Sequence, residues 1–381
     1  MHELERAEFD LQVLALNGLR RGRTTGSCAT AAVKAALTWM LCSGREQQVD
    51  VTLPDGRHYL RVPIAGLSDL DAATVRAEVL KDGGDDPDNT HGATIFAEVR
   101  RNALGTIRFF AGPGVGTATL PGLRVAVGEP AINPVPRKMM QQAVAEVLQD
   151  AGLPAGTGFD LTIGCENGEQ IARKTFNPRL GILGGISILG TSGIVEPMSM
   201  ASWVASIEVY VRVALAGDVP SVAYLPGKIG RDFARQVLEL PDKRMVQIAN
   251  FLGDALDFTQ VALEEQQRQL DTLWLAGHPG KLAKVLDGVW DTHSSKSNMA
   301  MGSVARVAAE RGLSAQLVKE MEQANTVEAV IEQMRHQHGA QAFWMDIEAR
   351  IGAQVHARVP AVKKVEIRLF DLAGTALGAA A

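Results

Sequence analysis

The sequence is poor in the features that mark several large classes of protein. Its three cysteines, Cys28, Cys42 and Cys165, are odd in number and form no CxxC pair, so we expect neither a disulfide framework nor a cysteine zinc site. No apolar run is both long and free of polar residues, which argues against a membrane span. The first ten residues, MHELERAEFD, contain acids and lack the basic and apolar regions of a signal peptide. These absences favour a cytoplasmic protein.

An excess of basic charge is also missing. The formal net charge is −5, whereas a general nucleic-acid-binding protein is usually basic. The chain contains no GxSxG, HExxH or GxxxxGK[ST] motif, and it shows no nucleophile–base triad. The sequence therefore gives no sign of a hydrolase triad, a zinc protease or a P-loop, and it argues against a nucleic-acid partner.

What the sequence does contain indicates two domains. The chain has 381 residues, of which 46% are apolar and 21% charged, a globular composition too long for one ordinary core. Residues 1–197 are rich in glycine and proline and mix short strands with helices, so they predict an α+β domain. Residues 198–381 contain three β-loop-α units, then polar helices and a last strand, KKVEIRLFD. Such units predict a parallel sheet covered on both faces, a Rossmann-like three-layer α/β domain.

Strand pairings are also predicted in the first domain. A hairpin is expected around the Pro-Asp-Gly turn at residues 54–56, and TIFAEVR and GTIRFFA look like another pair. The dipeptide Asn167-Gly168 is a strong hairpin signal, and it predicts that the segments on its two sides are paired strands, FDLTIGCE and EQIARKTF.

Two helices of the first domain are associated with candidate anion-binding residues. SCATAAVKAALTWML has Ser27 as a possible N-cap, and PRKMMQQAVAEVLQDAG follows a loop rich in proline. Free N–H groups at a helix start attract anions, and cationic side chains nearby reinforce the attraction. The alternative is a capped helix with solvated arginines and ordinary loops. The candidate substrate-binding residues at these helices are Arg23, Thr24, Thr25, Ser27, Asn133 and Arg137; three more anion-competent side chains, Lys174, Asn177 and Arg179, precede a glycine-rich run from Gly181 to Gly193.

Glycine-rich loops supply candidate cofactor contacts in both domains. KDGGDDPDNTHG does not have EF-hand spacing, but its glycines allow close backbone approach to a ligand; the alternative is an acidic surface loop. In a parallel sheet, ligands bind at the carboxyl ends of the strands, where LPGKIGRD, ANFLGDA and AGHPGKL are expected. The candidate cofactor-binding residues are Gly83, Gly84, Asp86, Gly227, Asn250, Gly277, His278 and Lys281.

Taken together and in order, seven motifs resemble the cobalt-precorrin-5B C1-methyltransferase family of anaerobic cobalamin (vitamin B12) biosynthesis. The resemblance runs from about Leu19 to Ser294, beyond which family members continue with an alanine-aspartate and an arginine, where this chain has SSKSNMAMGS. The motifs are RGRTTGSCATAA, DGGDDPDNTHG, GEPAINPVPR, KTFNPRLGILGGISILGTSGIVEPMS, ANFLGDAL, GHPGKLAK and DTHS.

The resemblance implies methylation of C1 of cobalt-precorrin-5B by S-adenosylmethionine, giving cobalt-precorrin-6A. It implies a carboxylate-rich corrin partner whose cobalt belongs to the substrate, so no metal held by the protein is expected. His91 and Asp85 are candidate bases for shifting a ring proton, and a homodimer is a reasonable default. Two alternatives stay open at this point: a nicotinamide-dependent reductase of a tetrapyrrole, and a non-catalytic corrinoid-binding protein.

Overall fold

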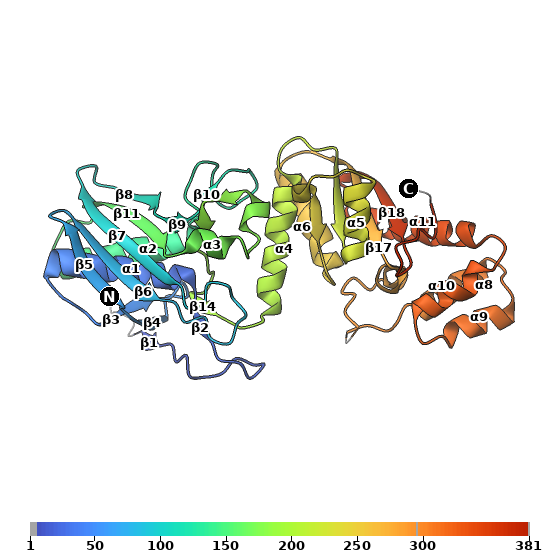
Figure 1. Cartoon of the computed structure of the whole chain (residues 1–381), viewed down its shortest axis with the longest axis horizontal. Helices are drawn as coiled ribbons and strands as arrows, with labels where there is room; N and C mark the ends of the chain where they lie inside the picture. The colour runs from blue at the N-terminus through green and yellow to red at the C-terminus, as the bar shows by residue number, and fades with distance from the viewer. Residues whose placement is uncertain (1–5, 295, 380–381) are drawn as a thin grey trace. The chain divides into compact units, whose positions relative to one another are not determined.

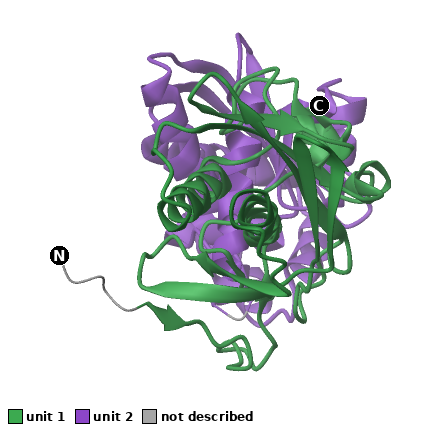
Figure 2. Ribbon diagram, turned by 90° about the vertical axis from the view of Figure 1, so that its left-hand side faces the viewer, with its two compact units in different colours: residues 1–199 green, residues 200–381 purple. Residues whose placement is uncertain are grey.

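The computed structural model describes residues 6–294 and 296–379, which divide into two compact units. Unit 1 comprises residues 1–199 and unit 2 residues 200–381 (Figure 2). Each unit has a large apolar core of its own. Across the described ranges, no helix is long and apolar enough to cross a membrane.

Unit 1 is built around two sheets and two long helices (Figure 1). Helix α1 (Thr25–Cys42) contacts strands of both sheets and packs along α2 (Pro134–Asp150). Its buried face is rich in alanine, which lets the helix approach the strands closely. The larger sheet has the order β5 (Gly66–Asp71), β6 (Thr74–Leu80), β7 (Thr94–Asn102), β11 (Gly158–Cys165) and β8 (Ile107–Ala111). The smaller sheet has the order β1 (Ala7–Glu8), β4 (His58–Pro63) and β3 (Gln48–Thr52).

The glycine-rich segment 181–195 ties distant parts of unit 1 together. Three short strands of this segment pair with strands that lie far away in the sequence, and each pair forms its own two-stranded sheet. The pairs are β12 (Ile182–Leu183) with β10 (Thr117–Ala118), β13 (Gly185–Ile186) with β9 (Gly114–Val115), and β14 (Ile194–Val195) with β2 (Gly22–Arg23). Two short helices precede the segment, α3 (Gly168–Ala172) and the 3-10 helix η1 (Asn177–Leu180).

Unit 2 contains a four-stranded sheet in which every pairing is parallel. Its order is β16 (Met245–Gln247), β15 (Ser221–Leu225), β17 (Leu270–Gly277) and β18 (Val362–Leu369). Successive residues of β15 belong to different clusters: Tyr224 packs in the large core, whereas Ala223 packs with Phe233 of α5. The helices are α4 (Met200–Leu215), α5 (Lys228–Gln236), η2 (Asp242–Arg244), α6 (Leu252–Glu265), α7 (Pro279–Leu282), η3 (Ala283–Asp287), α8 (Met301–Glu310), α9 (Ala315–Glu322), α10 (Val327–Arg335) and α11 (Ala340–Arg358).

The mixed α/β class and the hairpin around residues 54–56 are confirmed, since β3 and β4 are antiparallel neighbours. Two pairing predictions are wrong. TIFAEVR and GTIRFFA are strands β7 and β8, but β11 lies between them and pairs with both. The second wrong prediction is the hairpin at Asn167: this residue has φ 55° as a turn residue should, yet the chain then enters helix α3 instead of a strand.

Candidate functional site

The start of helix α1 is where the glycine-rich segment meets the first sequence motif. Thr24, and not Ser27, is the N-cap: its Oγ1 accepts a hydrogen bond of 3.0 Å from the backbone N–H of Ser27. The Ser27 hydroxyl donates to the carbonyl of Gly193 at 2.8 Å, and the Thr25 hydroxyl accepts from the N–H of Leu189 at 2.9 Å. These three predicted side chains therefore fix the glycine-rich segment onto the helix start.

The acidic loop, defined here as residues 81–92, packs backbone to backbone on the segment before α1. The N–H of Arg23 donates to the carbonyl of Asp82 at 2.7 Å, and the N–H of Asp85 donates to the carbonyl of Arg20 at 2.9 Å. In return the N–H of Arg20 donates to the Asp85 carboxylate at 2.7 Å. A Cβ atom on Gly84 would lie 2.2 Å from the Arg20 carbonyl oxygen, so only glycine fits.

His91 is held within this loop in one tautomer. Its Nδ1 accepts a hydrogen bond of 3.0 Å from the backbone N–H of Gly83. Because that N–H can only donate, Nδ1 carries the lone pair, and the proton of the neutral ring is on Nε2. The side chain is 50% exposed, so His91 can offer an N–H donor to a ligand. Acting as a base through Nδ1 would require breaking the bond to Gly83.

A buried ion pair lies within the acidic loop and stabilises it. Lys81 is 1% exposed, and its Nζ lies 2.5 Å from a carboxylate oxygen of Asp88. The N–H of Thr90 donates to the same carboxylate at 2.8 Å. Burial alone would raise the pKa of Asp88, but the Lys81 charge and its hydrogen bond lower that pKa below its ordinary value. Sequence reasoning missed Lys81, whose only signal is its position at the end of a strand before the acidic run.

Several other predicted residues of unit 1 serve internal contacts. Asn177 is buried, donating to the carbonyl of Gly185 at 3.0 Å and accepting from the Ser187 hydroxyl at 3.3 Å. Arg137 donates to the carbonyl of Ile132 at 2.8 Å and pairs with Glu129 at 3.0 Å.

Four further predicted residues lie in unit 1. The N–H of Asn133 bonds to the carbonyl of Ile188, and the Asp86 carboxylate accepts from the N–H of Met198 at 2.8 Å. Lys174 and Arg179 are exposed. The structure thus leaves Lys174 and Arg179 accessible to a ligand and gives Asp86 a structural contact.

The predicted residues of unit 2 come together at the carboxyl edge of the parallel sheet. Gly227 precedes α5, and a Cβ on Gly277 would lie 3.4 Å from Pro226, so the loops after β15 and β17 are neighbours. The N–H of Thr292 donates to the carbonyl of Asn250 at 3.0 Å, which joins the loop after β16 to the segment after η3.

Both ring nitrogens of His278 have partners at this edge. Its Nδ1 accepts from the N–H of Gly280 at 3.0 Å, and its Nε2 lies 2.8 Å from a carboxylate oxygen of Glu328. Lys281 follows one turn later and is partly buried. Near it lies Lys284, a buried lysine that sequence reasoning missed.

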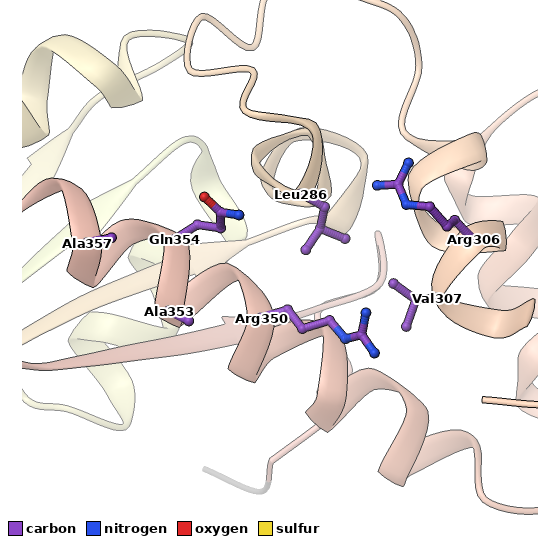
Figure 3. Close-up of a pocket in the computed structure, with 7 residues that line it drawn as sticks. All are labelled: Leu286, Arg306, Val307, Arg350, Ala353, Gln354 and Ala357. Carbon is purple, nitrogen blue, oxygen red and sulfur yellow. The ribbon is translucent and has the colours of Figure 1, made fainter. Parts of the chain in front are cut away.

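A cavity of about 460 Å³ in unit 2 is lined by none of the predicted residues (Figure 3). Arg306 and Arg350 extend into it, but Arg306 pairs with Asp287, and Arg350 pairs with Glu310. Because both charges are compensated, the cavity offers no ready anion site. Among the residues that the structure describes, no group of three or more His, Cys, Asp or Glu side chains is arranged to hold a metal ion.

Comparisons with known proteins give consistent findings. The family described as CbiD matches residues 14–197, and the family described as CbiD, C-terminal domain, matches residues 291–381. A protein of Ralstonia nicotianae is 63% identical over 100% of this chain and 98% of its own, and one of Chromobacterium violaceum is 60% identical over 99% of each. Both are named cobalt-precorrin-5B C(1)-methyltransferase. The crystal structure of a cobalamin biosynthesis protein (cbiD) from Archaeoglobus fulgidus is 25% identical, covers 79% of this chain and 88% of its own, and has a TM-score of 0.39.

Proposed function

This chain belongs to the family of cobalt-precorrin-5B C(1)-methyltransferases, and from that membership we propose its reaction. The enzyme transfers a methyl group from S-adenosylmethionine to C1 of cobalt-precorrin-5B, giving cobalt-precorrin-6A. The observation that carries this proposal is the 63% identity with a relative of that name over the whole chain. Cobalt enters as part of the substrate.

The chemistry needs little from the protein beyond alignment. The nucleophilic ring carbon forms a bond to the methyl carbon while the carbon–sulfur bond breaks, and the sulfonium leaves as neutral S-adenosylhomocysteine. Holding two reactants in line contributes up to ~7–11 kcal/mol in favourable cases. No nucleophilic side chain is required. His91, with its proton on Nε2, is suited to hydrogen-bond an acceptor on the macrocycle, and Asp85 stays a candidate for accepting a ring proton.

We place the macrocycle on unit 1, along the edge formed by the start of α1 and the glycine-rich segment. Lys174 and Arg179, which precede the glycine-rich segment in the chain, are exposed and are proposed as carboxylate partners, and Arg23 has a buried Nε that bonds to no described residue. Thr24, Thr25, Ser27 and Asn177 act by holding the segment in place. Asn133 and Arg137 anchor the loop before α2.

We place the methyl donor on unit 2, as a Rossmann-like domain would hold it. Four parallel strands with apolar side chains of helices packed on both faces support this assignment, since ligands of such sheets bind at the carboxyl edge. Gly83 and Gly84 are weaker candidates for donor contacts, because the side chains of Lys81 and His91 lie beside Gly83 and the backbone of Arg20 and Arg21 occupies the space beside Gly84. The donor contacts proposed here are Gly227, Asn250, Gly277, His278 and Lys281.

The test is a calorimetric titration of the purified protein with S-adenosylhomocysteine, repeated with NADPH, followed by incubation with S-adenosylmethionine and cobalt-precorrin-5B. We expect binding of S-adenosylhomocysteine alone, and a product heavier by one methyl group in mass spectrometry. Binding of NADPH instead would indicate a reductase, and binding of the macrocycle without methylation would indicate a carrier. Either result would reject the proposed reaction.

A further inference from the structure

Lys284 is a buried charge whose partners are all neutral. Its side chain is 4% exposed, and its Nζ donates to the carbonyl of Thr292 at 3.1 Å and to the hydroxyl of Ser297 at 2.9 Å. In the part of the chain that the structure describes, no carboxylate forms an ion pair with this ammonium. A buried charge normally has an opposite charge beside it, because removing it from water is costly.

The acids nearest to Lys284 in the sequence are already neutralised by other groups. Asp287 accepts a hydrogen bond from Ser303 and pairs with Arg306. Asp291 pairs with Lys296 at 2.9 Å. Both of these carboxylates therefore pair with other cations, and neither pairs with Lys284.

A second lysine shares this environment. Lys281 lies one turn before Lys284, and burial together with the Lys284 charge lowers the pKa of Lys281. Neither a hydrogen bond nor an ion pair of its ammonium is found within residues 6–294 and 296–379. Two like charges held close together in a partly desolvated place repel each other, and an anion placed between them would remove that repulsion.

The position of the pair is that of a ligand site. Both lysines follow β17 at the carboxyl edge of the sheet, and Thr292, which Lys284 holds, is bonded to Asn250 after β16. His278, which precedes them at this end of β17, is bonded on both ring nitrogens.

We propose that Lys281 and Lys284 form a subsite for a carboxylate group of a bound reactant. The inference rests on the proposed function, which brings two sources of carboxylate: the amino-acid end of the methyl donor and the acid side chains of the macrocycle. A carboxylate here completes the missing ion pair with a charge-assisted hydrogen bond.

The experiment compares Lys281→Met and Lys284→Met with a matched control, Lys319→Met, which removes one charge from an exposed position on α9. Three quantities are measured for each variant and the wild type: the Kd of S-adenosylhomocysteine, the Kd of 5′-methylthioadenosine, which lacks the amino-acid end, and the KM of cobalt-precorrin-5B. Lys281→Met, at a partly buried position, keeps the test decisive where Lys284→Met does not fold.

If the subsite holds the donor, both lysine variants weaken S-adenosylhomocysteine by about tenfold or more while 5′-methylthioadenosine binds as in the wild type. If it holds the macrocycle, KM rises by a similar factor and both Kd values stay constant. Unchanged values in folded variants overturn the subsite and leave the proposed function standing. A wild type that binds no S-adenosylhomocysteine and transfers no methyl group rejects the proposed function itself.

The midpoint of thermal unfolding, Tm, distinguishes a ligand-binding role of Lys284 from a structural role, because only the structural role predicts a large fall in Tm for Lys284→Met. Replacing an uncompensated buried ammonium with the similarly shaped Met side chain removes the cost of burying the charge but also removes the hydrogen bonds to Thr292 and Ser297, so the Tm of Lys284→Met should stay close to that of the wild type. A large fall in Tm, together with unchanged binding in Lys281→Met, shows that Lys284 serves the fold and overturns the subsite.

Discussion

Gly84→Ala should destabilise unit 1 more than Gly92→Ala, although both glycines have a positive φ and lie in the acidic loop. Their φ angles are +68° and +76°, so either alanine carries the left-handed cost of about 1 kcal/mol. At Gly92 nothing lies within 4 Å of the new Cβ, whereas at Gly84 the Cβ would meet the Arg20 carbonyl oxygen at 2.2 Å. Moving the two backbones apart adds about 1–3 kcal/mol.

Thiol labelling in urea measures this difference in unit 1 alone. All three cysteines lie there: Cys42 is exposed, whereas Cys28 and Cys165 are buried, and burial raises the pKa of both to about 12. One thiol therefore reacts in the folded protein, and two react only when unit 1 opens. We expect a lower urea midpoint for Gly84→Ala than for Gly92→Ala. Equal midpoints would refute the backbone contact between the acidic loop and the segment before α1.

Two further predictions concern buried polar pairs. Asp88→Asn leaves Lys81 without its charge partner and should cost about 3 kcal/mol at pH 7, measured by the same labelling. Because the pKa of Asp88 is lowered in the folded state, its contribution is complete above its ordinary pKa of 3.8 and is lost as the pH falls through the lower folded value. The variant should therefore lose less stability than the wild type between pH 5 and pH 3, and an equal loss would contradict this assignment. In unit 2, Thr259→Val strands the buried Tyr224 hydroxyl and should cost about 1–3 kcal/mol, whereas Tyr224→Phe should cost less, because Thr259 still donates to the carbonyl of Ala255. Urea unfolding followed by tryptophan fluorescence measures both, and the reverse order would contradict the hydrogen-bond pattern.

The four strands of the sheet in unit 2 could be predicted because each depends on local pattern. Apolar runs such as SVAYL in β15 and LWLA in β17 are strands in which both faces are buried, and the parallel order follows from the helices between them. Pairing in unit 1 depends on segments far apart in the chain. Nothing local in β7 or β8 indicates that β11, about fifty residues later, separates them. The turn dipeptide at Asn167 has the expected backbone, but Gly168 is required by its contact with Gly114, whose carbonyl oxygen would lie 2.1 Å from a Cβ.

In the candidate site, too, the sequence shows which residue types are present, but only the fold determines what surrounds each of them. Glycines in the acidic loop looked like places where a ligand approaches, yet at Gly84 the approaching atoms belong to Arg20 of the same chain. Lys284 had no distinguishing signal, because two lysines spaced three apart on a helix give the sequence no way to tell the buried one from the solvated one. The fold decides this by turning Lys284 inward and leaving its charge unpaired among the described residues. An unpaired buried charge lowers the stability of the fold, so folding alone gives no reason to retain it. The site is therefore best identified at residues whose arrangement is unfavourable for stability.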